Sequence, residues 1–483
     1  MSAELDPTFL AALGAVPATA WAEWFDDLHR GLSSSTPTPT HRLVATLPLP
    51  SARGHAAICL FETTGGPDEG RMHQAVLRRW AGAAPDGAEL LHVELDADGS
   101  VLWSLASAWA DDGIRAWLRE ALSAGASIRH DGWEWLAAPE QPAAAGESSS
   151  SSRQVSARRH DVVFFSPGAI GIFYRRLTRG ASPELDLLRH LERVPGVRVA
   201  PSLLGSAIII SPTGERTASS TLEDIVPDAD TIQTVLTNRL RRALEGDPSL
   251  QAVALDDVRA VGVITRELHA ALGRPFALGV LEGAMPATIR DVEVWVARAW
   301  STLTTASLAH ARVAEPQDSL AAAMQLLPGK LQQFGAAAEL DPGLTHRIHG
   351  SFRLDNVLVA PPRILSVIEF DGDASLSDLE RVMPQSPWRD VARLLVSIAE
   401  SAAQAACDVG GDDEALEIAW LWEREARKAY LEGYGSGGGA LHALLGIFEV
   451  EFASRLLLEH LTIDDCQRIV ATHTLERLSR SVV

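Results

Sequence analysis

The feature that most constrains this chain is a short β-forming island inside a helical half. From about residue 231 onward, most segments carry apolar residues at the spacing of amphipathic helices. Residues 345–373 (THRIHGSFRLDNVLVAPPRILSVIEFDGD) break this pattern, because the runs NVLVA and ILSVIEF flank a turn at Pro361-Pro362. We therefore predict one β-hairpin within a helical domain, with polar residues placed just before and after its strands.

The chain before residue 231 is a mixture of helices and strands. The Ala/Pro/Ser-rich run 137–152 has the composition of a linker, and it would separate an N-terminal α/β domain (1–136) from a smaller β-rich unit (153–230) and a helical unit (231–483). We expect helices at 17–32, 113–125 and 182–194, strands at 41–50, 56–64, 206–214 and 220–228, and a hairpin at 161–177. Ser182 and Pro183 are typical of a helix start.

Composition excludes several classes of function. The chain of 483 residues has 42 Lys+Arg against 63 Asp+Glu, a formal net charge of −21, so we expect neither nucleic acid nor a membrane surface as a partner. Cys59, Cys407 and Cys466 are odd in number and far apart, and we read each as a small core residue in a reducing, cytoplasmic setting. The sequence shows neither an apolar run of membrane-spanning length nor a signal-peptide pattern at its start.

A small β-rich lobe followed by a large helical lobe with one catalytic hairpin is the plan of kinase-like phosphotransferases. The chain resembles the maltokinase family, sugar kinases related to aminoglycoside phosphotransferases. The resemblance rests on RIHGSFRLDNVL (347–358), VIEFDGD (367–373), SPWRDVA (386–392) and IFYRRLTRGASPELDLLRHL (172–191). It implies an α+β, protein-kinase-like two-lobe fold preceded by an N-terminal α/β cap domain.

The resemblance also locates a catalytic loop that departs from the family's pattern. Ser351 stands where the family's H-G-D motif has the catalytic aspartate, after His349, and a serine hydroxyl is far too weak a base near neutral pH. Asp355 is close in sequence, but we expect it to point elsewhere. The metal-binding positions fall on Asn356, Glu369 and Asp371, where Glu369 replaces an aspartate.

The nucleotide side is altered as well. Ile172 stands at the position of the phosphate-binding lysine, and the only lysines of the chain are Lys330 and Lys428. Arg175 is a candidate substitute, although an exposed strand-end arginine is the simpler reading. Asp186 takes the place of the acid that would hold the lysine, and Glu223 and Ile225 fall at nucleotide-binding positions.

Two further groups of residues have alternative interpretations. The resemblance implies that Asp390 braces the catalytic loop, but it could simply cap the following helix. Trp388, Glu449 and Glu451 could face a bound sugar, as could Trp420 and Trp422, but tryptophans at helical spacing usually belong to a core and acids on a helix are usually solvated.

These departures favour a catalytically degenerate sugar-kinase homologue with a regulatory or scaffolding role in trehalose, maltose or glycogen metabolism. The alternative is an active maltokinase or related aminosugar kinase, which would require ATP and Mg²⁺. A third interpretation is a structural subunit. The resemblance implies a small sugar as ligand and a trehalose-synthase-like or other carbohydrate enzyme as partner.

Overall fold

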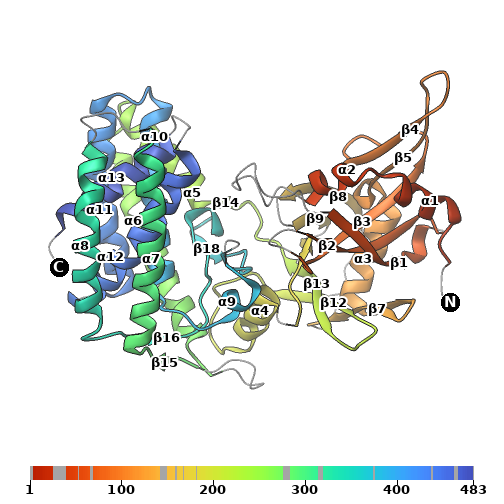
Figure 1. Cartoon of the computed structure of the whole chain (residues 1–483), viewed down its shortest axis with the longest axis horizontal. Helices are drawn as coiled ribbons and strands as arrows, with labels where there is room; N and C mark the ends of the chain where they lie inside the picture. The colour runs from red at the N-terminus through yellow and green to blue at the C-terminus, as the bar shows by residue number, and fades with distance from the viewer. Residues whose placement is uncertain are drawn as a thin grey trace. The chain divides into compact units, whose positions relative to one another are not determined.

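The computed structural model describes residues 4–25, 40–52, 54–65, 69–141, 149–157, 160–166, 168–180, 182–275, 283–313, 319–373, 376–436, 439–461 and 466–481 (Figure 1). The chain divides into two compact units. The first comprises residues 1–189 and 201–227, and the second comprises residues 190–200 and 228–483.

The first unit contains an antiparallel sheet with the strand order β1-β2-β3-β5-β4, and β11 also pairs with β3. Its strands are β1 (Thr40–Pro48), β2 (Ala56–Thr64), β3 (Met72–Ala81), β4 (Leu90–Leu95), β5 (Val101–Ser107) and β11 (Arg176–Leu177). Helices α1 (Pro7–Ala15) and α2 (Ala18–Phe25) contribute aromatic side chains to the core of this region, where the Trp21 and Phe61 rings lie 4.4 Å apart. The short turns η2 (Pro50–Ala52) and η3 (Ala108–Ala110) connect its elements.

A second antiparallel sheet of this unit has the order β6-β7-β12-β13-β10-β9-β8. Its strands are β6 (Ala126–His130), β7 (Trp133–Pro139), β8 (Ser149–Ala157), β9 (His160–Ser166), β10 (Ala169–Tyr174), β12 (Leu203–Ile210) and β13 (Arg216–Asp224). The expected helix at 113–125 is α3 (Asp112–Ala124), which ends at Gly125 as predicted.

Strands occupy both ends of the segment 137–152, where a linker was expected. β7 continues to Pro139 and β8 begins at Ser149, and both belong to the second sheet. Residues 153–157 pair with β9 through the backbone, and this pairing does not need apolar side chains. The serine-rich composition therefore gave no indication of a strand. Residues 142–148 lie outside the described ranges.

Helix α4 (Pro183–Arg193) confirms the predicted helix start. The hydroxyl of Ser182 accepts a hydrogen bond of 3.2 Å from the backbone N–H of Leu185, which is the geometry of an N-cap. The expected hairpin is formed by β9 and β10, which pair from His160–Tyr174 to Phe165–Ala169.

The second unit is mainly helical. Its helices are α5 (Ile232–Leu244), α6 (Ser249–Leu272), α7 (Ile289–His310), α8 (Ser319–Ala338), α9 (Asp378–Val382), α10 (Trp388–Asp408), α11 (Asp413–Tyr434), α12 (Gly439–His460) and α13 (Cys466–Arg480). The close approach of α6 and α11 depends on two glycines: a Cβ at Gly262 would lie 2.2 Å from the carbonyl oxygen of Tyr430, and a Cβ at Gly433 would lie 2.1 Å from that of Arg259. No described helix has the length and apolar character needed to cross a membrane.

The predicted β island is present within this unit. Strands β17 (Val357–Ala360) and β18 (Ile364–Val367) pair antiparallel across the expected turn, and β14 (Asp230–Thr231) extends the sheet beside β17. A further small pair joins β15 (Met285–Pro286) to β16 (Leu344–Thr345).

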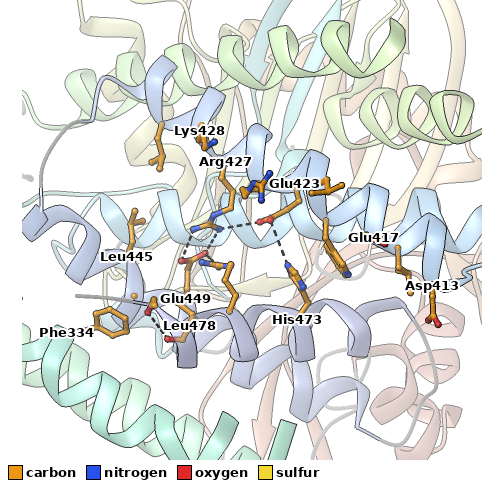
Figure 2. Close-up of a pocket in the computed structure, with 18 residues that line it drawn as sticks. Phe334, Asp413, Glu417, Glu423, Arg427, Lys428, Leu445, Glu449, His473 and Leu478 are labelled. Carbon is orange, nitrogen blue, oxygen red and sulfur yellow. Dashed lines mark hydrogen bonds and ion pairs between the residues drawn. The ribbon is translucent and has the colours of Figure 1, made fainter. Parts of the chain in front are cut away.

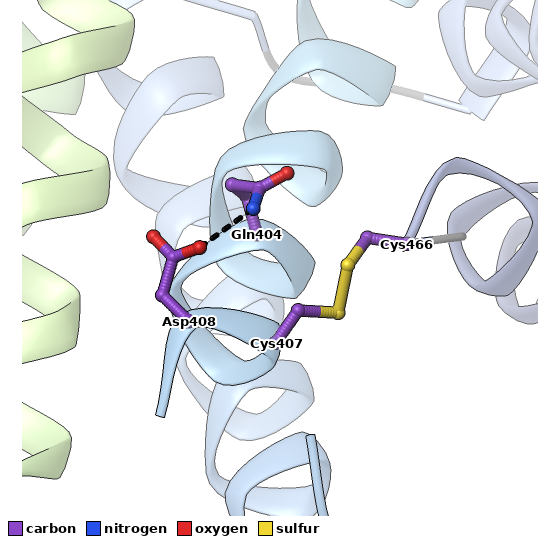
Figure 3. Close-up of a disulfide and its surroundings, with 4 residues drawn as sticks. All are labelled: Gln404, Cys407, Asp408 and Cys466. Atoms are coloured by element: carbon purple, nitrogen blue, oxygen red, sulfur yellow. Dashed lines mark hydrogen bonds between the residues drawn. A yellow bond between two sulfur atoms is a disulfide. The ribbon is translucent and has the colours of Figure 1, made fainter. Parts of the chain in front are cut away.

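A disulfide joins Cys407 at the end of α10 to Cys466 at the start of α13 (Figure 3). The interpretation of the cysteines as separate core residues is therefore wrong for this pair, and it holds for the buried, free Cys59. The separation of 59 residues gave no signal in the sequence, because only the packing of the helices brings the two Cα atoms to 6.5 Å.

Candidate functional site

The loop that precedes β17 is held by the carboxylate of Asp390. This carboxylate accepts hydrogen bonds of 2.8 Å from the backbone N–H groups of His349 and Gly350. Burial alone would raise the pKa of Asp390, but hydrogen bonds from His269 and the loop outweigh it and hold the pKa below its ordinary value. The N-cap position of α10 is Pro387, so the side chain of Asp390 is engaged with the loop and not with the start of its own helix.

A chain of side chains extends from Asp390 into the helical core. The imidazole of His269 lies between Asp390 Oδ2 at 3.2 Å and the hydroxyl of Tyr434 at 2.9 Å. An Nε2–H tautomer satisfies both contacts, since Nδ1 then accepts from the tyrosine hydroxyl. His269 and Tyr434 were missed by the sequence analysis, because nothing in their local sequence distinguishes them from other residues near helix ends.

The imidazole ring of His349 is also part of the support of the loop. Its Nε2 lies 2.9 Å from the carbonyl oxygen of Ile368, and its ring contacts the rings of Phe352 and Phe370 at centroid distances of 4.9 and 5.0 Å. Burial lowers the pKa of His349, so the ring is neutral near pH 7. A neutral, buried imidazole bonded to a carbonyl oxygen is a structural support for the loop.

Gly350 is required where the loop passes Gly372. A Cβ at Gly350 would lie 3.1 Å from the Cα of Gly372, and the φ of +87° also favours glycine. The next residue, Ser351, is half-buried. Its hydroxyl can donate or accept a hydrogen bond, but it cannot remove a proton from a sugar hydroxyl near neutral pH.

Asp355 is paired with an arginine of the same loop. Its carboxylate lies 3.2 Å from Nε of Arg353, and the Nη2 of that arginine lies 3.0 Å from the buried carboxylate of Glu400. Burial alone would lower the pKa of Arg353, but Glu400 and Asp355 raise it above its ordinary value. The expectation that Asp355 points elsewhere agrees with this pairing.

The expected metal ligands Asn356 and Glu369 lie together, but they bind each other. Asn356 Nδ2 donates to Glu369 Oε2 at 2.8 Å, and Asn356 Oδ1 accepts from the backbone N–H of Arg353 at 3.0 Å. Asp371, two positions after Glu369, is buried. Among the described residues there is no group of three or more His, Cys, Asp or Glu side chains arranged to hold a metal ion.

Glu451, a candidate sugar ligand, lies inside an ion-pair cluster. Arg389 makes two hydrogen bonds of 2.7 Å with its carboxylate, and Arg455 contacts it at 3.0 Å. Arg455 also reaches Asp373 at 2.6 Å. Although burial opposes ionisation, Arg389 and Arg455 hold the pKa of Glu451 below its ordinary value. Glu451 and Arg389 are both almost fully buried, so this carboxylate orders the packing of α10 against α12.

Glu449 and Trp388 are also buried. Glu449 pairs with Arg427 at 2.6 Å, and the indole of Trp388 packs edge-on against Tyr434 at 5.3 Å. The core interpretation of Trp388 agrees with its 6% exposure. Trp422 is buried as well, and its indole N–H lies 3.3 Å from the carbonyl oxygen of Gln251.

The position expected for the phosphate-binding lysine lies on a strand in the second sheet of the first unit. Ile172 of β10 pairs with Val162 on one side and with Thr221 on the other, and it is half-buried. Asp186 lies in the first turn of α4 and is half-buried. An isoleucine side chain offers no donor to a phosphate group, so this strand lacks the cation that a kinase of this type uses.

Arg175 is buried and is not an exposed strand-end residue. Its Nε and Nη2 lie 2.9 and 2.8 Å from Asp161 Oδ1, and it also pairs with Glu89. Its guanidinium lies 5.3 Å from the ring centroid of Trp24. Burial alone would lower the pKa of Arg175, but Asp161 and Glu89 raise it above its ordinary value.

The remaining nucleotide-side candidates lie at the end of β13. Glu223 is buried, and burial raises its pKa to about 7 even though the hydroxyl of Thr221 donates to it at 2.7 Å. The backbone N–H of Ile225 donates to the carbonyl oxygen of Gly168 at 2.9 Å, next to the β9–β10 turn. These contacts tie the end of β13 to the neighbouring hairpin.

Comparison with known proteins identifies the fold. No protein-family model matches the sequence. The structure is similar to that of glucosamine kinase in complex with glucosamine, ADP and inorganic phosphate, with a TM-score of 0.61, 19% identity, and coverage of 95% of this chain and 99% of that chain. Another crystal form of glucosamine kinase gives a TM-score of 0.63 at 19% identity, covering 92% of this chain and 96% of that chain.

The chain therefore has a kinase-like fold, in agreement with the class expected from its motifs. A solved protein that it matches over nearly the full length of both chains is glucosamine kinase. At 19% identity the likeness shows the fold, and the maltokinase resemblance remains a prediction.

Proposed function

We propose that this protein is a maltokinase-like sugar phosphotransferase homologue that transfers phosphoryl groups poorly or not at all. The observation that carries the proposal is the loop at Ser351. Asp390 still holds the loop in place, but the residue at the position of the base is a serine and the nearby Asp355 is paired with Arg353. Loss of general-base assistance lowers a rate by about 10²- to 10⁴-fold.

The state of the nucleotide-side residues supports the same proposal. Arg175, the best candidate to replace the absent lysine, is buried against Asp161 and Glu89. Releasing it would leave those carboxylates without their cation, which costs several kcal/mol, about 3 to 5 in comparable buried pairs. The catalytic loop, the phosphate-binding cation and the metal ligands thus all differ from the family's pattern. A working enzyme could compensate for one such change.

The alternative function is an active sugar or aminosugar kinase with ATP and Mg²⁺ as cofactors. It is favoured by the similarity to a solved glucosamine kinase that binds glucosamine and ADP. In this case Asn356 and Glu369 would have to exchange their mutual hydrogen bond for contacts with the ion.

Calorimetry and a turnover assay discriminate between these functions. Mg·ATP titrated to millimolar concentration should give little or no heat, and ADP release with glucosamine or maltose should stay near background. Micromolar affinity that requires Mg²⁺, or turnover in the ordinary kinase range of roughly 1–100 s⁻¹, would overturn the proposal. A solved active kinase of the same fold, assayed in parallel, controls for the coupling enzymes.

For a degenerate kinase we further propose a regulatory or scaffolding role beside a carbohydrate enzyme, such as a trehalose-synthase-like protein. The net charge of −21 favours a partner with a complementary basic surface, mainly through the association rate. Purified trehalose synthase should bind the immobilised protein more slowly as salt rises. Absence of binding at low salt would remove this role.

A further inference from the structure

The helical unit contains a cavity of about 810 Å³ that is bordered by α8, α11, α12 and α13 (Figure 2). This volume lies within the range of small-molecule binding sites, about 300 to 1,000 Å³. Its wall combines apolar side chains such as Phe334 and Leu445 with a group of charged side chains from three helices. None of these residues belongs to the loop around Ser351.

One end of the cavity, at Trp420, lies far from the catalytic loop along α11. Tyr434, near the end of that helix, contacts Trp388 and, through His269, is linked to Asp390. Trp420 precedes Tyr434 by 14 positions, which corresponds to about 21 Å along an α-helix. The Trp420 end of the cavity is therefore distant from the site described above, whereas Leu431, at its other end, lies within one helical turn of Tyr434.

A charged layer bridges the three helices on one side of the cavity. Arg427 of α11 makes hydrogen bonds of 2.6 and 3.0 Å with Glu449 of α12, and Arg477 of α13 adds one of 2.9 Å to the same carboxylate. Burial alone would raise the pKa of Glu449, but the two arginines hold it below its ordinary value. Glu449 is thus fully satisfied by the protein.

Glu423 differs from Glu449 in this respect. Its side chain is only 3% exposed and lines the cavity, yet the nearest nitrogen atoms are Arg427 Nη1 at 3.6 Å and His473 Nε2 at 4.0 Å. Within the described part of the chain, neither contact is short enough to be a full hydrogen bond. A carboxylate that lines a cavity without a short contact to a protein donor can accept hydrogen bonds from a ligand or from water in the cavity.

An aromatic surface lies beside this carboxylate. The rings of Trp420 and His473 stack with centroids 3.9 Å apart and planes 4° from parallel, and both side chains line the cavity. Burial, helped by Arg477, lowers the pKa of His473 to about 4, so the ring is neutral near pH 7. A flat indole, a hydrogen-bond acceptor and neighbouring arginine donors form a combination that suits a ligand with both apolar faces and hydroxyl groups.

We propose that this cavity is a second binding site, for a neutral mono- or disaccharide, in which Glu423 accepts hydrogen bonds from sugar hydroxyls and Trp420 packs against a pyranose face. Anionic ligands are disfavoured, because the two carboxylates of Glu449 and Glu423 together balance the charges of Arg427 and Arg477, and Glu423 would repel an anion. The proposal does not depend on whether the protein transfers phosphoryl groups.

Titration calorimetry with glucose, maltose and, as an anionic comparator, inorganic phosphate tests the site in the full-length protein. Glucose or maltose should bind, and Glu423→Gln should weaken binding at least about tenfold, since hydrogen bonds to a charged group are the ones lost. Glu432→Gln is the matched control, because this exposed residue of the same helix pairs with Arg259 of α6, and neither residue lines the cavity. It should leave binding unchanged.

Labelling with 5-fluorotryptophan gives a second measurement that needs no change in Glu423. The ¹⁹F resonance that is missing from Trp420→Phe belongs to Trp420, and it should shift during titration with the sugar that binds. The proposal is overturned if neither sugar binds at 10 mM, if phosphate alone binds, or if binding leaves both the Trp420 resonance and the affinity of Glu423→Gln unchanged.

Discussion

The carboxylate of Asp390 accepts a 2.8 Å hydrogen bond from the backbone N–H of Gly350, although the two residues are 40 positions apart. This contact and its counterpart at His349 set the path of the loop that carries Ser351. Under the proposed function, this loop keeps its structural support while Ser351 stands at the position expected for the base.

Replacing Asp390 with asparagine should destabilise the protein. The new side-chain amide would place its NH₂ group against one backbone N–H of the loop. Its contact with His269 would no longer involve a charged carboxylate. We expect the free energy of unfolding to fall by about 2 to 4 kcal/mol in urea denaturation. Asp408→Asn, at the exposed end of the same helix, should change it by less than about 0.5 kcal/mol. Equal effects of the two substitutions would contradict the role assigned to Asp390.

Arg175→Met should be strongly destabilising, because Asp161 would remain buried without its cation. The expected loss is about 3 to 5 kcal/mol, measured by chemical denaturation. The control is Arg179→Met, whose exposed guanidinium pairs with Glu62 at 3.3 Å and should contribute about 1 kcal/mol or less. If Arg175→Met folds with unchanged stability, Arg175 is available for another role and the degenerate interpretation weakens.

The disulfide between Cys407 and Cys466 should stabilise the helical unit. Closing a loop of this length contributes about 4 kcal/mol in the chain-entropy account. Cys407→Ser and Cys466→Ser should therefore lower the midpoint of unfolding equally, and the double variant should be no worse than either one. A thiol reagent should find one reactive cysteine per chain, Cys59, and only after unfolding. Three reactive thiols in the unreduced, unfolded protein would show that the bond is absent.

The pH dependence of stability should contain a contribution from His346. Burial, together with the nearby His269, lowers the pKa of His346 to about 4, below the value of about 6.5 expected in the unfolded chain. The unfolded chain therefore binds more protons between these values, and stability is lost as the pH falls from 6.5 to 4.

The loss due to His346 is at most about 3 kcal/mol at the acidic end of this window. It should be absent in His346→Gln, so the difference in unfolding free energy between wild type and variant should shrink between pH 7 and pH 4.5. Glu223, whose raised pKa acts in the opposite direction, is present in both proteins and cancels. Parallel pH profiles would contradict the assignment.

Restoring the altered positions together should produce activity where single changes do not. Ser351→Asp, Glu369→Asp and Ile172→Lys supply the base, the metal ligand and the cation expected of this fold, and residues that act as a unit contribute non-additively. ADP release with maltose or glucosamine should rise above background only in the triple variant. A single Ser351→Asp substitution with full activity would show that the nucleotide side was intact.

Much of the fold follows from local sequence signals. The hairpin around Pro361-Pro362, the capped start of α4 and the end of α3 at Gly125 each depend on residues within a few positions, and each was predicted. Strand β8 was not predicted, because its pairing with β9 depends on backbone hydrogen bonds and its serine-rich composition carries no strand signal.

The candidate site was less accessible to prediction, because it depends on contacts between distant residues. Motif spacing located Asp390 and Ser351, but the burial of Arg175 depends on Asp161 and Glu89, and the latter is 86 positions away. The pairing of Glu451 with Arg389 spans 62 positions in the same way. Acidic residues on a helix look alike in a sequence whether they face water, a sugar or a buried arginine.

The bond between Cys407 and Cys466 also makes a covalent ring of the chain between them, and that ring contains α11 and α12. A protease that cuts once inside the ring would leave both pieces attached. Such a nicked protein would migrate as a single chain on a denaturing gel without reductant and separate into two fragments with it. Preparations checked only under non-reducing conditions would therefore count cleaved molecules as intact, including those cut beside the proposed sugar cavity.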